Sequence, residues 1–292
     1  MSVTIKDVYN TMSDIAQHIQ NLSGTSSSCP YIQQRDVILA TFKNSGSYSV
    51  SSIVQRLIVI DSLYATNASY NYFSFEDMAE AIFNIGPSEQ YAINYFEGIA
   101  KGAVDKLGIF SGKYGIRKNA LPGATAMSLL SKYAYYLLLN CNQNDLGFPI
   151  YDSLVKDNYP KILRQALGKI VSKQTVNKYC IEDYIKDLEL LRVGLFGSNT
   201  NRLHGMQQFD ALDAYLWRVG KVKKGNLSLL FSKSQYKIFI QNLSLTGRQM
   251  DSELFDKEVK KLCHLMTSVA ILQGIYTYPS AMHALIDHCK QI

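Results

Sequence analysis

The stretch ATAMSLLSKYAYYLLLN, residues 124–140, has the composition of one long and mostly buried helix. Its polar residues recur at i, i+3, i+4 and i+7, so they share one narrow face. These residues are Ser128, Ser131, Lys132 and Tyr135. A single lysine on such a face predicts that the helix borders a cleft into which the amine opens. The alternative is that Lys132 lies at the surface and extends its charged end into water.

Apolar spacing typical of helices continues over most of the chain. We expect helices over residues 4–22, 31–43, 49–67, 74–86, 87–108, 124–140, 160–171, 174–194 and 207–221, with two or three more in 226–289. Ser74 and Ser88 are each placed to cap the helix that follows. Two-residue alternation is confined to YKIFIQNLSL, residues 236–245. The sequence therefore predicts an all-α protein.

The chain has 292 residues, of which 47% are apolar and 18% charged, so it can fold as one large domain or as two lobes. It has no apolar run of about 18 residues and no signal-like start, so we expect no membrane span and a cytoplasmic protein. Five scattered cysteines without a CxxC pair predict free thiols in a reducing compartment. The Cys and His residues near the C-terminus, between 263 and 289, lack the spacing of a zinc site, and we expect no metal or cofactor.

The net charge of +6 is carried partly by three basic clusters. Their members are Lys101, Lys106, Lys113, Arg117 and Lys118, then Lys156, Lys161, Arg164, Lys169 and Lys173, and finally Arg218, Lys221, Lys223 and Lys224. Clusters of this kind can line a surface that follows nucleic-acid phosphates. The alternative is that they are ordinary solvated faces of helices.

The stretch FPIYDSLV, residues 148–155, places one acid among apolar and aromatic residues. A buried carboxylate is costly unless another group pairs with it or uses it. Phe148-Pro149 favours an extended approach, which puts Asp152 near the start of the next helix. Asp152 is then either a helix cap or an acid that its own backbone holds opposite Lys132.

The order of LPG at 121–123, Lys132 and FPIYD at 148–152 resembles that of the helix-hairpin-helix DNA glycosylases, in particular the oxoguanine-glycosylase-like members. The resemblance covers about 35 residues. It departs from the family pattern in the missing second hairpin glycine, in the later position of the lysine and in the extra residue Tyr151. These departures point to an unusual base, such as the modified bases that a prokaryotic antiviral branch attacks in phage DNA. Glucosylated hydroxymethylcytosine is one such base.

The resemblance implies two helical lobes with a cleft between them. Residues 31–145 would form one lobe, which ends in the degenerate hairpin and the lysine helix. Residues 1–30 and 146–292 would form the second lobe, which carries the catalytic aspartate. The implied partner is duplex DNA with a flipped base, bound by a monomer.

The resemblance also implies roles for individual residues. Asp152 would stabilise the cationic sugar, and Lys132 would attack the sugar, bind phosphate or orient Asp152. The DNA contacts would come from Asn67, Lys113, Arg117, Lys118, Gly123, Ser131, Lys156 and Lys221. The base pocket would be lined by Tyr151, His204, Asp213 and Trp217. Alternatives are a turn asparagine at 67, a core role for Trp217, a helical nucleic-acid-binding protein without chemistry, and a helical scaffold in which Asp152 is only a cap.

Overall fold

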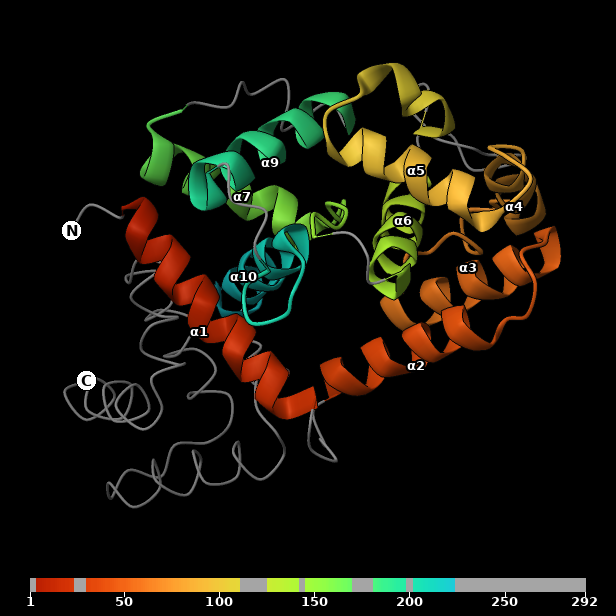
Figure 1. Cartoon of the computed structure of the whole chain (residues 1–292), viewed down its shortest axis with the longest axis horizontal. Helices are drawn as coiled ribbons and strands as arrows, with labels where there is room; N and C mark the ends of the chain where they lie inside the picture. The colour runs from red at the N-terminus through yellow and green to blue at the C-terminus, as the bar shows by residue number, and fades with distance from the viewer. Residues whose placement is uncertain are drawn as a thin grey trace.

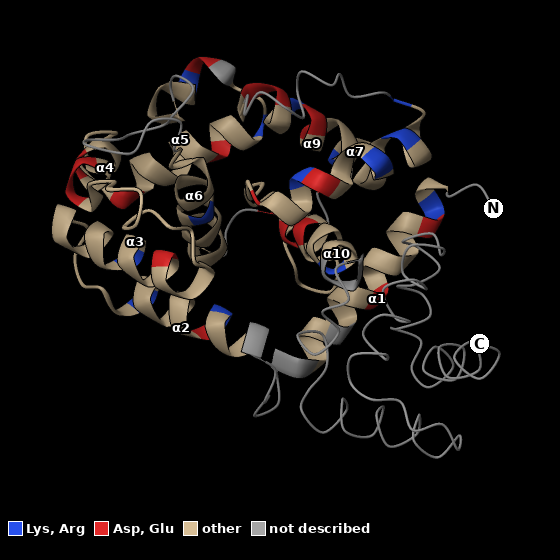
Figure 2. Ribbon diagram, turned by 180° about the vertical axis from the view of Figure 1, so that it is seen from behind, with Lys and Arg blue, Asp and Glu red and all other residues tan. Residues whose placement is uncertain are grey.

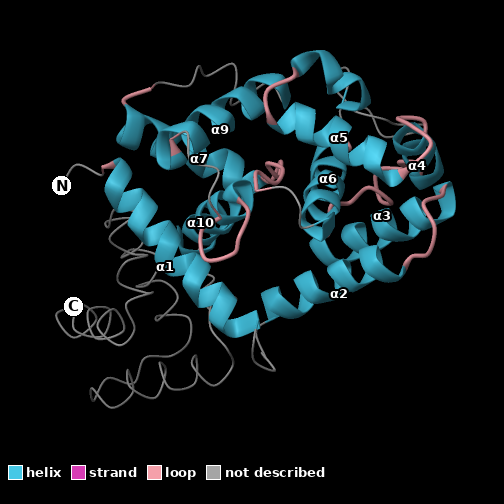
Figure 3. Ribbon diagram, in the orientation of Figure 1, coloured by secondary structure: helices cyan, strands magenta, loops and turns pink. Residues whose placement is uncertain are grey.

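The structure is a computed structural model that describes residues 4–23, 30–110, 125–141, 145–169, 181–197 and 202–223 (Figure 1). The elements are α1 (Ile5–Ser23), α2 (Pro30–Asn44), α3 (Val50–Tyr64), α4 (Phe75–Phe83), α5 (Glu89–Ala100), the 3-10 helix η1 (Val104–Phe110), α6 (Met127–Cys141), α7 (Ser153–Leu167), α9 (Ile181–Phe196) and α10 (Gln208–Lys223). Within these ranges the fold is all-α, as predicted, and Figure 3 draws no strand among them. The one β-type contact there is an isolated bridge between Leu203 and Met206.

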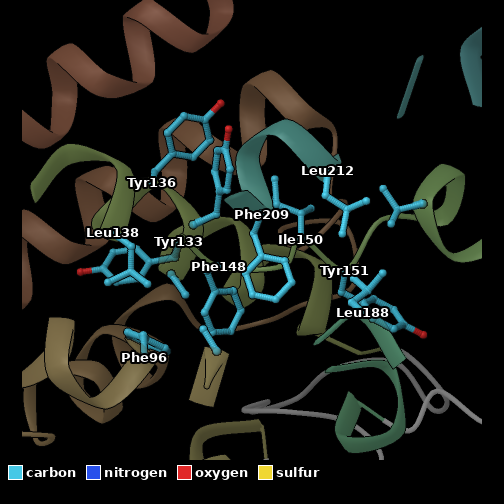
Figure 4. Packing of buried hydrophobic residues seen from close by; sticks show 14 of the residues in the cluster. Phe96, Tyr133, Tyr136, Leu138, Phe148, Ile150, Tyr151, Leu188, Phe209 and Leu212 are labelled. Atoms are coloured by element: carbon cyan, nitrogen blue, oxygen red, sulfur yellow. The ribbon is translucent and has the colours of Figure 1, made fainter. Parts of the chain in front are cut away.

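Helix α6 lies at the centre of the core. All of its residues from Leu129 to Leu138 are buried. Aromatic rings from three other segments meet at its side, and Figure 4 shows several of them side by side. The ring of Phe96 lies 5.9 Å from that of Phe148 and 6.3 Å from that of Tyr133. Aromatic rings remove large apolar areas from water, so this cluster fixes the connector that follows α6.

The helices pack mainly within two sets, which lie on opposite sides of the molecule in Figure 1. Helix α3 packs on α2, α4 and α6, and α5 packs on α6. In the other set, α10 packs on α1, α7 and α9. Contacts of α1 with α2, and of α9 with α5 and η1, join the two sets.

A buried arginine ties the helices of the first set together. Arg56 of α3 is 2% exposed and donates hydrogen bonds to the carbonyl of Phe42 at 3.1 Å and to Ser45 Oγ at 2.8 Å. It also forms an ion pair with Glu89 at the start of α5. A buried guanidinium is tolerated only when its charge and its N–H groups find such partners.

Several predicted boundaries need correction. Helix α3 ends at Tyr64 rather than at residue 67, because Ala65 adopts a left-handed conformation at φ 47°. Helix α7 begins at Ser153, well before residue 160. Ser74 caps α4 as expected by accepting the N–H of Asp77, whereas the side chain of Ser88 makes no such bond.

Other predictions fall outside the structure's described ranges. They include the helices expected in 226–289, the strand candidate 236–245 and the start of the helix expected from residue 174. In the part of the chain that the structure describes, no helix combines the length and the hydropathy that a membrane crossing requires.

The packing of α10 on α7 leads to a first prediction. A Cβ atom at Gly220 would lie 2.8 Å from Leu154 Cβ and 3.0 Å from Asn158 Nδ2. Overpacking of this kind costs about 1–3 kcal/mol, which exceeds the gain of about 1 kcal/mol in helix propensity. We therefore expect Gly220→Ala to lower the free energy of unfolding by about 1–2 kcal/mol in urea titrations.

Gly98→Ala in α5 is the matched control, because its Cβ would meet only the flexible side chain of Lys106. It should leave stability unchanged or raise it. Equal effects of the two substitutions would contradict the close approach of α10 to α7.

Candidate active site

Lys132 is enclosed near the middle of α6, with 2% of its side chain exposed. Its amine donates a hydrogen bond to Ser128 Oγ at 2.7 Å and lies 5.2 Å from the centre of the Tyr64 ring. The same nitrogen is 3.7 Å from Asp152 Oδ2, an ion-pair distance longer than a direct hydrogen bond. The alternative of a lysine that reaches the surface is therefore wrong.

The two oxygens of Asp152 have different partners. Oδ1 accepts the N–H of Leu154 at 2.8 Å and so caps α7. Oδ2 faces the amine of Lys132, and 23% of the side chain remains exposed. The two interpretations of Asp152 are thus compatible, since the cap fixes the carboxylate in the orientation that presents its second oxygen to the lysine.

The turn that carries Asp152 is held by the residues just before it. The N–H of Tyr151 donates to Ser131 Oγ at 2.9 Å, and the carbonyl of Ile150 accepts the hydroxyl of Tyr184. The Tyr151 and Tyr184 rings meet edge to face at 4.9 Å. Each bond joins the turn to a different helix, so Asp152 has little freedom to move relative to Lys132.

The same connector also fixes the start of α10. The N–H groups of Gln208 and Phe209 donate to the carbonyls of Asp145 and Leu146 at 2.9 and 2.8 Å. Gly147, at φ +76°, lies so close to Gln207 that a Cβ would be 3.0 Å from Gln207 Oε1. The first N–H groups of a helix have no acceptor within the helix. Here two carbonyl groups of the connector accept two of these N–H groups of α10.

Helix α10 brings two more carboxylates toward α6. Asp210 is 1% exposed and accepts both terminal nitrogens of Arg35, at 2.7 and 2.6 Å. It also accepts the hydroxyl of Tyr135 from α6. Bidentate pairing with arginine is a strong form of charge-assisted hydrogen bond, and it ties α2, α6 and α10 together.

Burial and neighbouring charges shift the pKa values of two groups in this cluster. Burial lowers the pKa of the Lys132 amine, against the opposing effects of Asp152 and Asp213. Burial raises the pKa of Asp213 well above its usual range, helped by Asp152 and Asp210 and opposed by Lys132 and Arg35. Both shifts favour the neutral form of the group, as expected where charge is removed from water.

Asn67 lies on a loop whose shape Asp61 determines. One oxygen of Asp61 accepts the N–H of Ala68 at 2.9 Å, and the other accepts Ser69 Oγ at 3.1 Å. Asn67 is exposed at φ 59°, and its carbonyl accepts the N–H of Asn71. This conformation matches the alternative of a turn asparagine. The side chain of Asn67 is exposed, so the predicted contact with DNA stays a prediction.

Other predicted residues lie in different settings. Ser131 is fully buried and bonded to Tyr151, so the expectation that it contacts DNA is corrected. Tyr151 is 7% exposed within the core, and Trp217 is half-buried against that core. His204 lies on an exposed turn, where its Nε2 is 2.9 Å from Ser13 Oγ of α1.

The predicted phosphate contacts are placed only in part. Lys156 is half-exposed on the first turn of α7, just after Asp152. Figure 2 shows basic residues along α7 and acidic residues on α4. Lys221 lies in α10. Lys113, Arg117, Lys118 and Gly123, with the rest of the hairpin, fall outside the residues that the structure describes.

Sequence reasoning missed Arg35, Tyr64, Asp61 and Asp210. The signal for Asp210 was its place in an otherwise apolar part of α10, three residues before Asp213. Arg35 and Tyr64 meet their partners only through the packing of distant helices, which no local pattern shows. Across the described part of the chain, no group of three or more His, Cys, Asp or Glu side chains could hold a metal ion.

Comparisons with protein-family models, with curated proteins and with solved structures find no match to this chain. Any assignment of function therefore depends on the geometry of the site and on its chemistry.

The bond that positions the turn gives a second prediction. In Ser131→Ala the buried N–H of Tyr151 loses its acceptor, and an unsatisfied buried group costs about 1–3 kcal/mol. We expect a loss of that size in the free energy of unfolding. Ser62→Ala, which removes an exposed hydroxyl of α3, is the control and should change stability by less than about 0.5 kcal/mol. Similar values for both variants would contradict the role of Ser131.

Proposed function

We propose that the protein is a DNA glycosylase, which flips a modified base out of duplex DNA and breaks its N-glycosidic bond to leave an abasic site. The observation that carries this proposal is the pairing of Lys132 and Asp152. A buried amine lies 3.7 Å from a carboxylate that is fixed by its own helix and remains 23% exposed. The exposed part of Asp152 can contact a substrate while the buried amine and the helix cap hold it in place.

Asp152 suits the role of stabilising a cationic sugar. Breaking an N-glycosidic bond leaves positive charge on the sugar, and a preorganised carboxylate nearby lowers the energy of that state. Because Oδ1 is occupied by the cap, Oδ2 is the oxygen that can face the sugar or orient a water molecule.

Lys132 suits attack on the sugar, because an amine must be neutral to act as a nucleophile. Its burial lowers its pKa and so favours that form. Orienting Asp152 through the ion pair remains the other role that we expect for Lys132, and the two roles predict different products.

We infer a two-lobed arrangement with the pair at the junction. Lys132 belongs to α6, which packs on α2, α3 and α5, whereas Asp152 begins α7, which packs on α9 and α10. The loop that carries Asn67 starts directly after Tyr64, whose ring contacts the Lys132 amine. We therefore propose that this loop enters the space that an everted nucleotide leaves.

The third prediction tests this function. Duplexes with different modified bases, including phage DNA with glucosylated hydroxymethylcytosine, are incubated with the protein and assayed for abasic sites. We expect product from the wild type and a rate about 10²- to 10³-fold lower for Asp152→Asn, because an electrostatic stabiliser of the transition state is lost. Asp36→Asn and Lys43→Ala, at exposed positions of α2, are matched controls that should keep full activity.

Borohydride separates the two roles of Lys132. A trapped protein–DNA adduct that disappears in Lys132→Ala indicates attack by the amine, whereas base release without an adduct indicates that Lys132 orients Asp152. DNA binding without product from any duplex would favour a helical nucleic-acid-binding protein that lacks the chemistry. Full activity of Asp152→Asn would contradict the proposed site.

A further inference from the structure

Asp210 and Asp213 lie three residues apart on α10 but differ in their hydrogen-bond partners. The carboxylate of Asp210 accepts hydrogen bonds from Arg35 and Tyr135. Asp213 has a carboxyl oxygen, Oδ1, that is enclosed and accepts no hydrogen bond from the described residues. Folding alone does not explain a carboxyl group in this position, since an enclosed polar atom without a partner destabilises the protein.

Charged and titratable groups of several helices influence Asp213 electrostatically. They are Lys132 of α6, Asp152 at the start of α7, Arg35 of α2 and Asp210 on its own helix, and Asp213 in turn influences Tyr184 of α9. The two cations already have carboxylate partners, since Arg35 binds Asp210 and Lys132 lies beside Asp152. Among the residues that the structure describes, Asp213 is therefore the carboxyl group of the cluster that forms no ion pair.

Asp213 is half-buried and its Oδ1 is enclosed, so its ionised form would add a further negative charge near Asp152 and Asp210 with one oxygen shielded from water. Burial and these neighbours raise the pKa of Asp213, so it retains its proton at a pH at which ordinary aspartates have lost it. A carboxyl group whose surroundings favour its protonated form is suited to act as an acid.

We propose that Asp213 is the general acid of this site, which transfers its proton to the base as the glycosidic bond breaks. This assignment rests on the proposed glycosylase function. Asp152, whose Oδ1 is engaged in the cap, stabilises the sugar. The two carboxyl groups thus act on the two fragments that the reaction separates.

The step balances in atoms and electrons. The electron pair of the bond between C1′ and the base nitrogen moves to the base, which takes the proton of Asp213. In the hydrolytic form, a water oxygen bonds to C1′, and Asp152 accepts the proton that this water loses. Exchange with solvent returns the proton to Asp213. The sum is the addition of one water molecule, which gives the free base and an abasic sugar.

The test compares the wild type with Asp213→Asn, which keeps the shape and the hydrogen-bonding capacity but has no acidic proton. Single-turnover release of base from phage DNA with glucosylated hydroxymethylcytosine is measured from pH 5 to 9, together with DNA affinity. Loss of a general acid costs about 10²- to 10⁴-fold in rate. We expect a loss within that range for Asp213→Asn with unchanged affinity, and the fall in wild-type rate at high pH should be absent from the variant.

Asp187→Asn is the matched control. The carboxyl group of Asp187 on α9 also has a raised pKa through burial, but its partner is the hydroxyl of Tyr159. This variant should keep the wild-type pH profile. Asp213→Glu, which retains an acidic proton, should recover part of the activity.

Unfolding gives a readout that needs no DNA. Because the folded pKa of Asp213 lies above its unfolded value, its contribution to stability is complete at low pH and is lost as pH rises through the folded pKa. Asp213→Asn should therefore gain stability relative to the wild type as pH rises above about 4.

Three results would overturn the assignment, and they can be told apart. If the wild type releases base and Asp213→Asn does so equally fast, only the role of Asp213 fails. If the stability difference between these two proteins does not change with pH, Asp213 is ionised and cannot be the acid. If the wild type releases no base from any duplex, the glycosylase function fails and the acid assignment fails with it.

Discussion

The structure depends on how the FPIYD turn is held between helices. Its main chain is bonded to Ser131 of α6 and to Tyr184 of α9, and Phe148 packs in the aromatic cluster beside α6. The connector just before the turn supplies hydrogen bonds to the start of α10. One short segment therefore sets the position of Asp152 relative to Lys132 and to the acids of α10. These bonds bring the charged groups together in one region of the core.

Electrostatics explains why this arrangement is unusual for a structural core. Removing charges from water is expensive, and a buried ion pair often adds little net stability compared with apolar residues of the same size. The side chain of Lys132 is nevertheless only 2% exposed, and its amine has Ser128 and Asp152 as partners. Asp213 adds an enclosed carboxyl oxygen that accepts no hydrogen bond from any residue that the structure describes. Perturbed ionisable groups that gather in this way are typical of functional sites.

Local patterns predicted much of the helical fold and the central pair. The spacing of polar residues in 124–140 was enough to put Lys132 on the polar face of a helix. The extended approach through Phe148-Pro149 was enough to put Asp152 at the start of the next helix. They could not show that Ser131 lies beneath the turn, because its partner Tyr151 is 20 residues away. The ion pair between Arg35 and Asp210 spans 175 residues and follows from tertiary packing. The shape of the Asn67 loop depends on Asp61, whose acceptor role was missed because it lies within a helix.

The most direct test of the central pair is a titration of Lys132 by carbon-13 NMR of the lysine ε-carbons, with Lys132→Met used to assign its resonance. Because burial lowers the pKa of this amine, its resonance should titrate below those of the surface lysines. Asp152 opposes that shift, so Asp152→Asn should lower the pKa further. A Lys132 that titrates together with the surface lysines, or that does not respond to Asp152→Asn, would contradict the pairing of the two residues.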